Sequence, residues 1–86
     1  MEEDEKYYAV IQARIRALAP ELTVERKQHD EQGANYVLLV RHTGTGKSRE
    51  MEVPEDPVWD AVDNQDKREE ARIDKIVLET RDELSR

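Results

Sequence analysis

The feature that most constrains the fold is the apolar run Tyr36-Val37-Leu38-Leu39-Val40, which leads into a glycine-rich segment at residues 42–48. Successive side chains of a strand point to opposite faces, so this run is apolar on both faces. Gly44 and Gly46 then favour a tight reversal of the chain. We therefore expect a central β-strand over residues 36–42 that ends in a hairpin turn.

Two flanking segments, residues 22–27 and 49–53, alternate apolar and polar side chains as half-buried strands do. Residues 29–35 between the first two strands have the composition of a turn, in which Gly33 or Asn35 can adopt a positive φ.

The register of the second hairpin follows from a two-residue type II′ loop at Gly44-Thr45. This loop places Leu38 opposite Met51 and Tyr36 opposite Val53. The apolar side chains of the three strands then share one face, whereas a one-residue slip would mix the two faces.

Helical periodicity appears on both sides of the strands. Residues 4–19 gather Tyr7, Tyr8, Ile11, Ile15 and Leu18 within about a third of the helical wheel. After Pro54 we expect a short helix over residues 57–63 with Asp56 as its N-cap, a break near Asn64, and a long helix over residues 67–84. One unbroken helix would be far longer than the sheet.

These elements predict an α+β fold of the order α-β-β-β-α. It is a two-layer sandwich in which a three-stranded antiparallel meander carries the N-terminal and C-terminal helices on one face. The length of 86 residues fits one domain over residues 1–86.

The helices suffice to cover only one face of this sheet, so the other face is a candidate contact surface. Val37 and Leu39 form an apolar strip at its centre, with Arg41, Glu50 and Glu52 nearby. Paired apolar residues on an uncovered sheet face mark a partner-binding or self-association surface. The side chains predicted on this face are Thr23, Glu25, Lys27, Val37, Leu39, Arg41, Ser48, Glu50 and Glu52.

The charge balance narrows the class of partner. The chain has 14 Lys and Arg against 21 Asp and Glu, for a net charge of −7. Residues 50–63 hold six acidic side chains and no basic one. Such a surface repels phosphate backbones and suits a basic protein partner.

Composition also narrows the cellular compartment in which we expect the protein. The chain has no cysteine, which excludes disulfides and thiolate chemistry. Its start, with Glu2, Glu3 and Asp4, is the reverse of the basic start of a signal peptide, and no apolar run approaches the length of a membrane span. We expect a cytoplasmic protein that does not engage a membrane.

Gly46-Lys47-Ser48 matches the end of a P-loop, but Arg41 stands where the first glycine of that motif belongs. The residues after Ser48 alternate like a strand and run into Pro54, so no helix N-terminus would face a phosphate. We expect a hairpin tip rather than a nucleotide site, and no cofactor.

The predicted α-β-β-β-α order is similar to that of double-stranded RNA-binding domains, and Lys67 and Arg68 stand at the start of the last helix as basic residues do in that family. The resemblance implies RNA contacts through the first helix, the loop between the first two strands and the start of the last helix. The loop here holds Asp30 and Glu31, however, and acidic residues interleave with the basic ones. Nucleic-acid binding through Lys47, Arg49, Lys67 and Arg68 is therefore the alternative hypothesis.

The remaining candidate chemistry is sparse. His29 and His42 fall at opposite ends of the predicted sheet, as exposed strand-end residues, and cannot share a metal ion or form an acid–base pair. The acidic run lacks the spacing of an EF-hand, so no metal is expected. Trp59 shares a helical face with Val62 and is expected in the core.

The sequence thus supports two hypotheses. The first is a small, acidic, non-enzymatic domain that binds another protein or a second copy of itself, because nothing places a nucleophile beside a base. The second is the nucleic-acid module, with nucleotide binding at residues 44–48 as its weaker form.

Overall fold

The computed structural model describes residues 4–86, so Glu2 and Glu3 of the acidic start, which was interpreted as unlike a signal peptide, lie outside the described residues. The elements, in order, are α1 (Glu5–Leu18), β1 (Leu22–Asp30), β2 (Asn35–His42), β3 (Ser48–Pro54), α2 (Glu55–Asp63) and α3 (Lys67–Leu84). The predicted α+β class and the α-β-β-β-α description are confirmed, with α2 as an additional short helix. In the part of the chain that is described, no helix is both long and apolar enough to cross a membrane.

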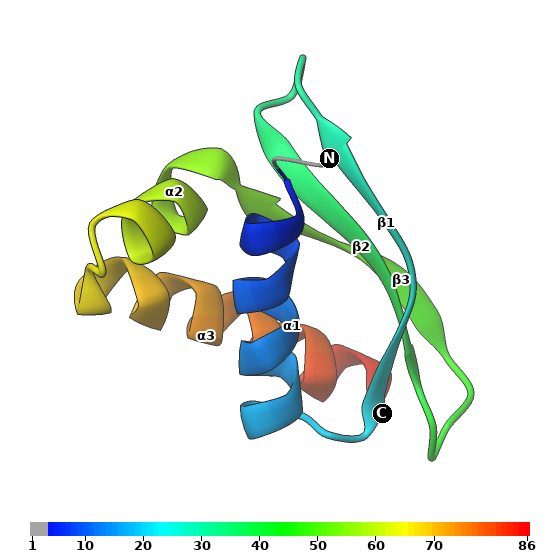
Figure 1. Ribbon diagram of the computed structural model, residues 1–86. Coiled ribbons are helices and arrows are strands. Elements are labelled where there is room, and N and C mark those ends of the chain that lie inside the picture. Colours follow the sequence, from blue (N-terminus) through cyan, green and yellow to red (C-terminus); the bar gives the residue numbers. More distant parts are fainter. Residues whose placement is uncertain (1–3) are drawn as a thin grey trace.

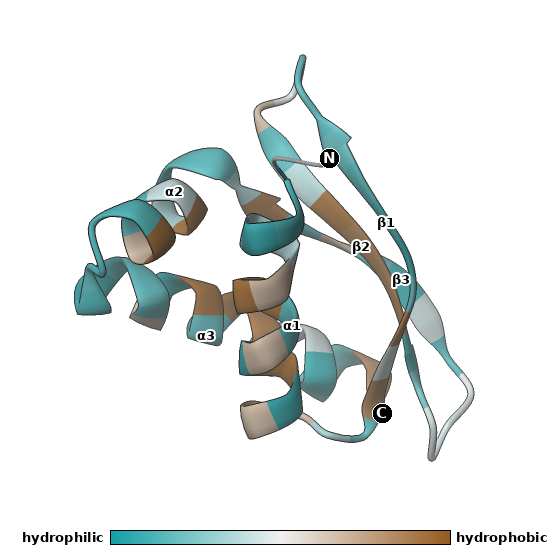
Figure 2. Cartoon of the chain, in the orientation of Figure 1, coloured by the Kyte–Doolittle hydropathy of each residue, from teal (hydrophilic) through white to brown (hydrophobic). Residues whose placement is uncertain are grey.

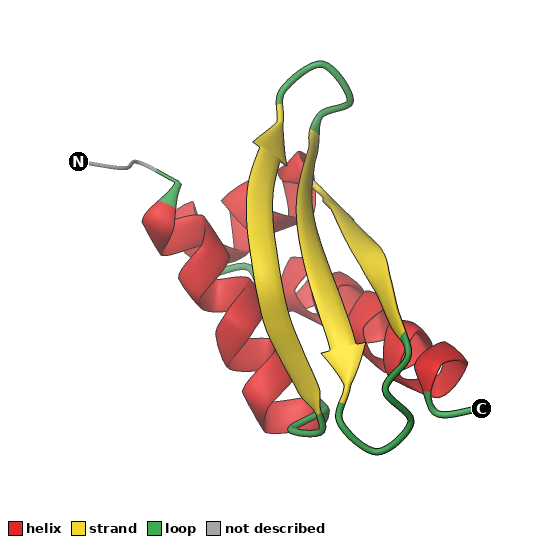
Figure 3. Ribbon diagram, turned by 90° about the vertical axis from the view of Figure 1, so that its right-hand side faces the viewer, coloured by secondary structure: helices red, strands yellow, loops and turns green. Residues whose placement is uncertain are grey.

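The three strands form one antiparallel sheet in the order β1-β2-β3. All three helices lie on the same side of this sheet (Figures 1 and 3). The residues of high hydropathy, coloured brown, lie mainly where the two layers face each other (Figure 2). Tyr36, Leu38, Met51 and Val53 of the sheet are fully buried there, in one hydrophobic cluster with Ile11 of α1.

The helices were located closely by their periodicity. Tyr8, Ile11 and Ile15 of α1 are buried, as predicted. α3 spans the predicted residues 67–84, and its N-cap is Asp66, whose side chain accepts hydrogen bonds from the backbone N–H groups of Arg68 and Glu69.

The connection between α2 and α3 is a true break. Asn64 ends α2 and Gln65 takes a φ of 52°, so residues 57–85 form two helices. The prediction of Asp56 as N-cap is wrong, because α2 begins at Glu55, directly after Pro54. Asp56 therefore lies in its first turn.

The register of the β2–β3 hairpin is confirmed. Leu38 pairs with Met51 and Tyr36 pairs with Val53. The predicted two-residue type II′ loop is wrong, because Gly46 and not Gly44 has a positive φ, of 77°. His42 N donates to the carbonyl oxygen of Lys47 (2.8 Å), so the loop contains four residues.

A β-bulge in β1 changes which side chains face the helices. The pairing with β2 shifts between Val24 and Arg26, so Glu25 is an extra residue in the strand. Beyond the bulge, Lys27 faces the helix layer, where its Nζ lies 3.6 Å from Glu5 Oε1. The prediction of Lys27 on the outer face is wrong because strict alternation does not hold across a bulge.

β1 is also longer than predicted. It continues to Asp30, so His29 is a paired strand residue opposite Tyr36 rather than part of a turn. In the shortened turn, Ala34 takes the positive φ, of 59°, and not Gly33 or Asn35. The carbonyl oxygen of Ala34 accepts a hydrogen bond from Glu55 N (2.9 Å), which joins this turn to the start of α2.

Candidate functional site

The outer face of the sheet carries no helix, yet it is not a bare apolar surface. Val37 is only 7% exposed, and Leu39 is half-buried. Arg26 and Gln28, which the bulge turns outward, lie beside them on β1, and Glu50 flanks them on β3. Long polar side chains cover apolar neighbours with their aliphatic stems. Val37 lies on the outer face, as predicted, but offers little free apolar surface there.

Arg41 lies at the margin of the same face. Its Nε is 3.1 Å from Glu25 Oε2, the carboxylate of the bulge residue. Glu50 and Glu52 are both exposed. Of the predicted contact residues, the two glutamates on β3 therefore remain the most accessible, together with Arg41.

The hairpin tip that resembles the end of a P-loop is closed by its own hydrogen bonds. The N–H groups of Gly44 and Thr45 donate to His42 Nδ1 (3.0 and 3.2 Å), and Gly46 N donates to the carbonyl oxygen of His42 (2.8 Å). Lys47 N donates to Thr45 Oγ1 (3.2 Å). These backbone groups are engaged, and the strand β3 follows where a P-loop requires a helix.

The basic residues of the nucleic-acid hypothesis are not brought together. Lys47 and Arg49 lie near the C-terminal end of α3, where Lys47 Nζ donates to the carbonyl oxygen of Arg86 and Arg49 pairs with Glu83. Lys67 and Arg68 are at the N-terminal end of α3, about 27 Å away along an 18-residue helix. Lys67 Nζ also lies 4.0 Å from Glu70 Oε1. The two pairs therefore lie at opposite ends of α3.

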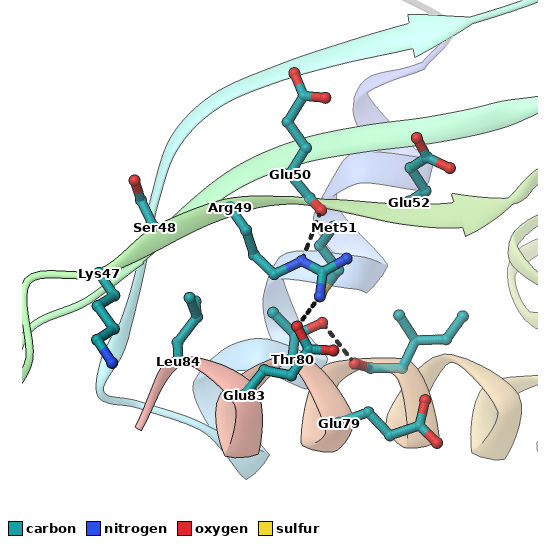
Figure 4. Close-up of a pocket in the computed structure, with 11 residues that line it drawn as sticks. Lys47, Ser48, Arg49, Glu50, Met51, Glu52, Glu79, Thr80, Glu83 and Leu84 are labelled. Carbon is teal, nitrogen blue, oxygen red and sulfur yellow. Dashed lines mark hydrogen bonds and ion pairs between the residues drawn. The ribbon is translucent and has the colours of Figure 1, made fainter. Parts of the chain in front are cut away.

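A groove of about 1040 Å³ runs between β3 and α3 (Figure 4). Its floor contains Met51 from β3 and Ile76, Thr80 and Leu84 from α3. Its charged rim has two sides: Glu50 and Glu52 come from β3, and Glu79 and Glu83 come from α3. We call these lining residues, together with Lys47, Ser48 and Arg49, the acidic groove.

The charges of the acidic groove do not cancel. The groove is lined by four glutamates and two basic residues, and all six are exposed. Arg49 pairs with Glu83 and donates from Nε to the carbonyl oxygen of Glu50 (3.2 Å), as the dashed lines of Figure 4 show. Lys47 turns to the C-terminal end of the chain. Within residues 4–86, no side-chain hydrogen bond or ion pair engages the carboxylates of Glu50, Glu52 or Glu79.

A second group of polar side chains lies at the opposite end of the sheet, around the buried ring of Tyr36. The His29 ring stacks on Tyr36, with the centroids 4.3 Å apart and the planes 14° apart. Trp59 Nε1 donates to the Tyr36 hydroxyl (2.9 Å), which donates to Asp4 Oδ1 (3.4 Å). We call this group the Tyr36 cluster; its members are Asp4, Tyr7, His29, Tyr36, Glu55, Trp59 and Asp63.

The His29 side chain joins β1, on which it lies, to the start of α1 and the start of α2. Its Nδ1 lies 3.1 Å from Asp4 Oδ2, and its Nε2 lies 2.5 Å from Glu55 Oε2. Burial lowers the pKa of His29, but the hydrogen bond to Glu55 and the charge of Asp4 outweigh it, so the pKa lies above its ordinary value. Both ring nitrogens can donate only in the imidazolium form, which these two carboxylates favour.

The hydroxyl groups of the Tyr36 cluster are held in their neutral form. Burial raises the pKa of Tyr36 to about 12, with the charge of Asp4 adding to the effect and the hydrogen bond from Trp59 opposing it. Burial and a hydrogen bond to Asp63 raise the pKa of Tyr7, whose hydroxyl donates to Asp63 Oδ2 (2.9 Å).

Two sequence predictions concerning this end are wrong. His29 was expected to be exposed, but its side chain is only 14% exposed. Trp59 was expected in the core, but it is 36% exposed and the only large hydrophobic residue exposed within residues 4–86. Pro57 and Val58 take the buried positions of α2 instead, and the indole N–H of Trp59 donates to the Tyr36 hydroxyl. The separation of His29 and His42 to opposite ends of the sheet is confirmed.

Within residues 4–86, no three His, Asp or Glu side chains are arranged so that they could hold a metal ion. Comparison of the chain with family models, with curated proteins and with solved structures finds no match. The assignment of function therefore rests on the geometry of the acidic groove and the Tyr36 cluster.

Proposed function

We propose that this chain is a non-enzymatic, cytoplasmic protein-interaction module that binds a basic segment of a partner protein at the acidic groove. The observation that carries the proposal is the set of carboxylates on the groove rim. Glu50, Glu52 and Glu79 are exposed and without a side-chain partner among the described residues, in a groove large enough for a peptide. Groups left unpaired in a concave surface are available to a ligand of opposite charge.

The Tyr36 cluster does not compete for this role. Its carboxylates already accept hydrogen bonds from His29, Tyr7 and Tyr36. The network explains these polar residues as support for the fold. Nothing in it leaves a nucleophile beside a free base, which supports a binding role over an enzymatic one.

The hypothesis of self-association through the outer face is less favoured, since Val37 is covered by its polar neighbours. The hypothesis of nucleic-acid binding is less favoured as well, because the basic residues lie at the two ends of α3.

The test is an NMR titration with two acetylated and amidated peptides of equal length, one alternating Lys and Val and the other alternating Glu and Val. The Lys-Val peptide is expected to shift the amide signals of Glu50, Glu52, Glu79 and Glu83, with an affinity that falls as salt is added. The Glu-Val peptide is expected to cause no shift.

The matched variants are Glu79→Gln and Glu31→Gln. Each removes one negative charge, but Glu31 lies in the first turn, outside the groove, with a side chain 84% exposed. Glu79→Gln should weaken the Lys-Val peptide by about two- to fivefold at low salt, whereas Glu31→Gln should change it little. Equal effects would reduce the interaction to net charge and overturn the proposal. Shifts at Lys67 and Arg68 with duplex RNA, without peptide binding, would support the nucleic-acid hypothesis instead.

A further inference from the structure

β3 is an open edge of the sheet with its backbone groups available along one side. His42 and Lys47 are a hydrogen-bonded pair, and hydrogen-bonded and non-bonded pairs alternate along an antiparallel ladder. Arg49, Met51 and Val53 therefore direct their N–H and C=O groups toward β2. Glu50 and Glu52 direct theirs away from the sheet.

These outward groups are largely unused. The carbonyl oxygen of Glu50 accepts from Arg49 Nε. Within residues 4–86, no group accepts the N–H of Glu50 or Glu52. Unpaired N–H and C=O groups along an edge are a template for one more strand.

α3 provides a support for such a strand. It lies behind β3 and its C-terminal part extends past the open edge of the sheet (Figure 3). Ile76 is half-buried in the floor of the acidic groove, with Glu79 and Glu83 on the outer side. An added strand would therefore rest its inward side chains on α3 and leave its outward side chains beside Glu50 and Glu52.

The charge of the edge selects the occupant. The β2–β3 register is regular, without the bulge that interrupts β1, so β3 is straight enough to pair over its length. A second copy of β3 would bring Glu50 and Glu52 against like charges, which is destabilising for strands that lie side by side. A strand that carries Lys or Arg on its outward side has the complementary charge.

We propose that an extended basic segment of a partner protein adds to β3 as a fourth strand, with Lys or Arg beside Glu50 and Glu52 and apolar side chains on Ile76. Strand addition obtains affinity from backbone hydrogen bonds and specificity from alternate side chains. The inference rests on the proposed function, since it specifies how the acidic groove holds its partner.

The first test is amide hydrogen exchange with the Lys-Val peptide. At a peptide concentration about ten times Kd, exchange of the Glu50 and Glu52 amides should slow by about tenfold, because only the free form exchanges. The Lys27 amide, which points away from β2 on the other edge, should not change. Binding without slower exchange at Glu50 and Glu52 would overturn strand addition and leave the proposed function standing. Absence of any binding would overturn both.

The second test removes hydrogen bonds from one edge of the peptide. One peptide is methylated at the backbone nitrogen of every Lys, and the other at that of every Val. In an extended strand the N–H groups of the Lys residues point to one edge and those of the Val residues to the other, so each modification blocks one edge. The peptide whose free edge faces β3 should bind like the parent. The other should lose about tenfold or more, since it forfeits two or more backbone hydrogen bonds to β3. Equal affinity of all three peptides would overturn strand addition.

A pair of protein variants completes the design. Glu50→Gln removes the charge, and Glu50→Pro removes both the charge and the outward N–H. Proline is tolerated on an edge strand where the N–H faces solvent. The proline variant should bind the Lys-Val peptide several-fold more weakly than the glutamine variant, and circular dichroism shows whether it is folded. If the proline variant does not fold, the affinities of the methylated peptides test strand addition without it. A dimer of the free protein with slow exchange at Glu50 would identify a second copy as the occupant and overturn the proposal.

Discussion

The two ends of this molecule use acidic residues in opposite ways. In the Tyr36 cluster, Asp4, Glu55 and Asp63 each accept a hydrogen bond from a side chain on another element. In the acidic groove, Glu50 and Glu79 extend into solvent with no such partner among the described residues. Carboxylates that satisfy donors of their own chain stabilise a fold, and carboxylates left unpaired on a surface are available to other molecules.

The contrast also distinguishes a region that holds the fold together, the Tyr36 cluster, from a region that is open to a ligand, the acidic groove. The Tyr36 cluster connects the start of α1, the end of β1, the start of β2 and the helix α2. The acidic groove lies between β3 and α3, where the buried Met51 and Thr80 line its floor and Arg49 pairs with Glu83 across it. Substitutions at the first site should therefore affect stability, and those at the second should affect binding.

The largest effect is expected from His29→Ala. The substitution removes two charge-assisted hydrogen bonds and the ring stacked on Tyr36, so it should lower the free energy of unfolding by about 2–4 kcal/mol near pH 6. Urea unfolding followed by circular dichroism measures the loss. His42→Ala is the matched control, because His42 accepts only from two backbone N–H groups of an exposed loop, and should cost about 1 kcal/mol. Equal losses would contradict the structural role of the cluster.

The same residue should make stability depend on pH. The pKa of His29 is raised in the folded protein, so the folded state binds the proton more tightly than the unfolded chain. This stabilisation is fully present below the pKa of an unfolded histidine, about 6.5, and is lost as the pH rises through the higher pKa of the folded state. Unfolding free energies from about pH 6 to about pH 9 should fall for the native chain. In His29→Gln the decline should be much smaller, and an unchanged decline would assign it to another group.

Ala34→Gly should be a smaller change with the opposite sign. Ala34 has a φ of 59° in the turn that joins β1 to β2, a conformation that glycine adopts without steric cost. The substitution should stabilise the protein by about 0.5–1 kcal/mol. Ala71→Gly, at an exposed position inside α3, should destabilise by about 1 kcal/mol. Thermal unfolding of the two variants gives the sign of each effect directly.

The smallest effect on stability is expected in the acidic groove. Glu79→Gln should change the unfolding free energy by less than about 0.5 kcal/mol, because no side chain within residues 4–86 pairs with its carboxylate. Asp74→Asn, on the same helix, should cost about 1–2 kcal/mol, since Asp74 accepts from Arg14 Nε (2.7 Å) and Nη2 (2.9 Å). A loss at Glu79 as large as that at Asp74 would show that the groove carboxylates support the fold.

Much of the fold was predictable because its binary pattern is consistent. The opposition of Leu38 to Met51 followed from the requirement that apolar side chains share a face. The break at Asn64 followed from the length of the sheet. The bulge at Glu25 was not predictable, since one extra residue in a polar segment leaves no mark on hydrophobic periodicity.

The candidate site was predicted only in part. Glu50 and Glu52 were identified from charge, but their counterparts Glu79 and Glu83 become neighbours only when α3 packs beside β3. The Tyr36 cluster was missed, because His29, Asp4 and Glu55 are distant in sequence and the bulge turns His29 inward. The one available signal was the length of β2, which requires a partner strand that continues through residues 29 and 30.

The position of Trp59 has a consequence for how the protein can be observed. It is the only tryptophan of the chain, and its indole N–H donates to the Tyr36 hydroxyl. Its fluorescence is therefore an intrinsic reporter of the Tyr36 cluster and is remote from the acidic groove. If α2 detaches before the sheet unfolds, the emission of Trp59 will change at lower denaturant than the circular dichroism signal does. Coincident transitions would instead show that the network around Tyr36 unfolds together with the sheet.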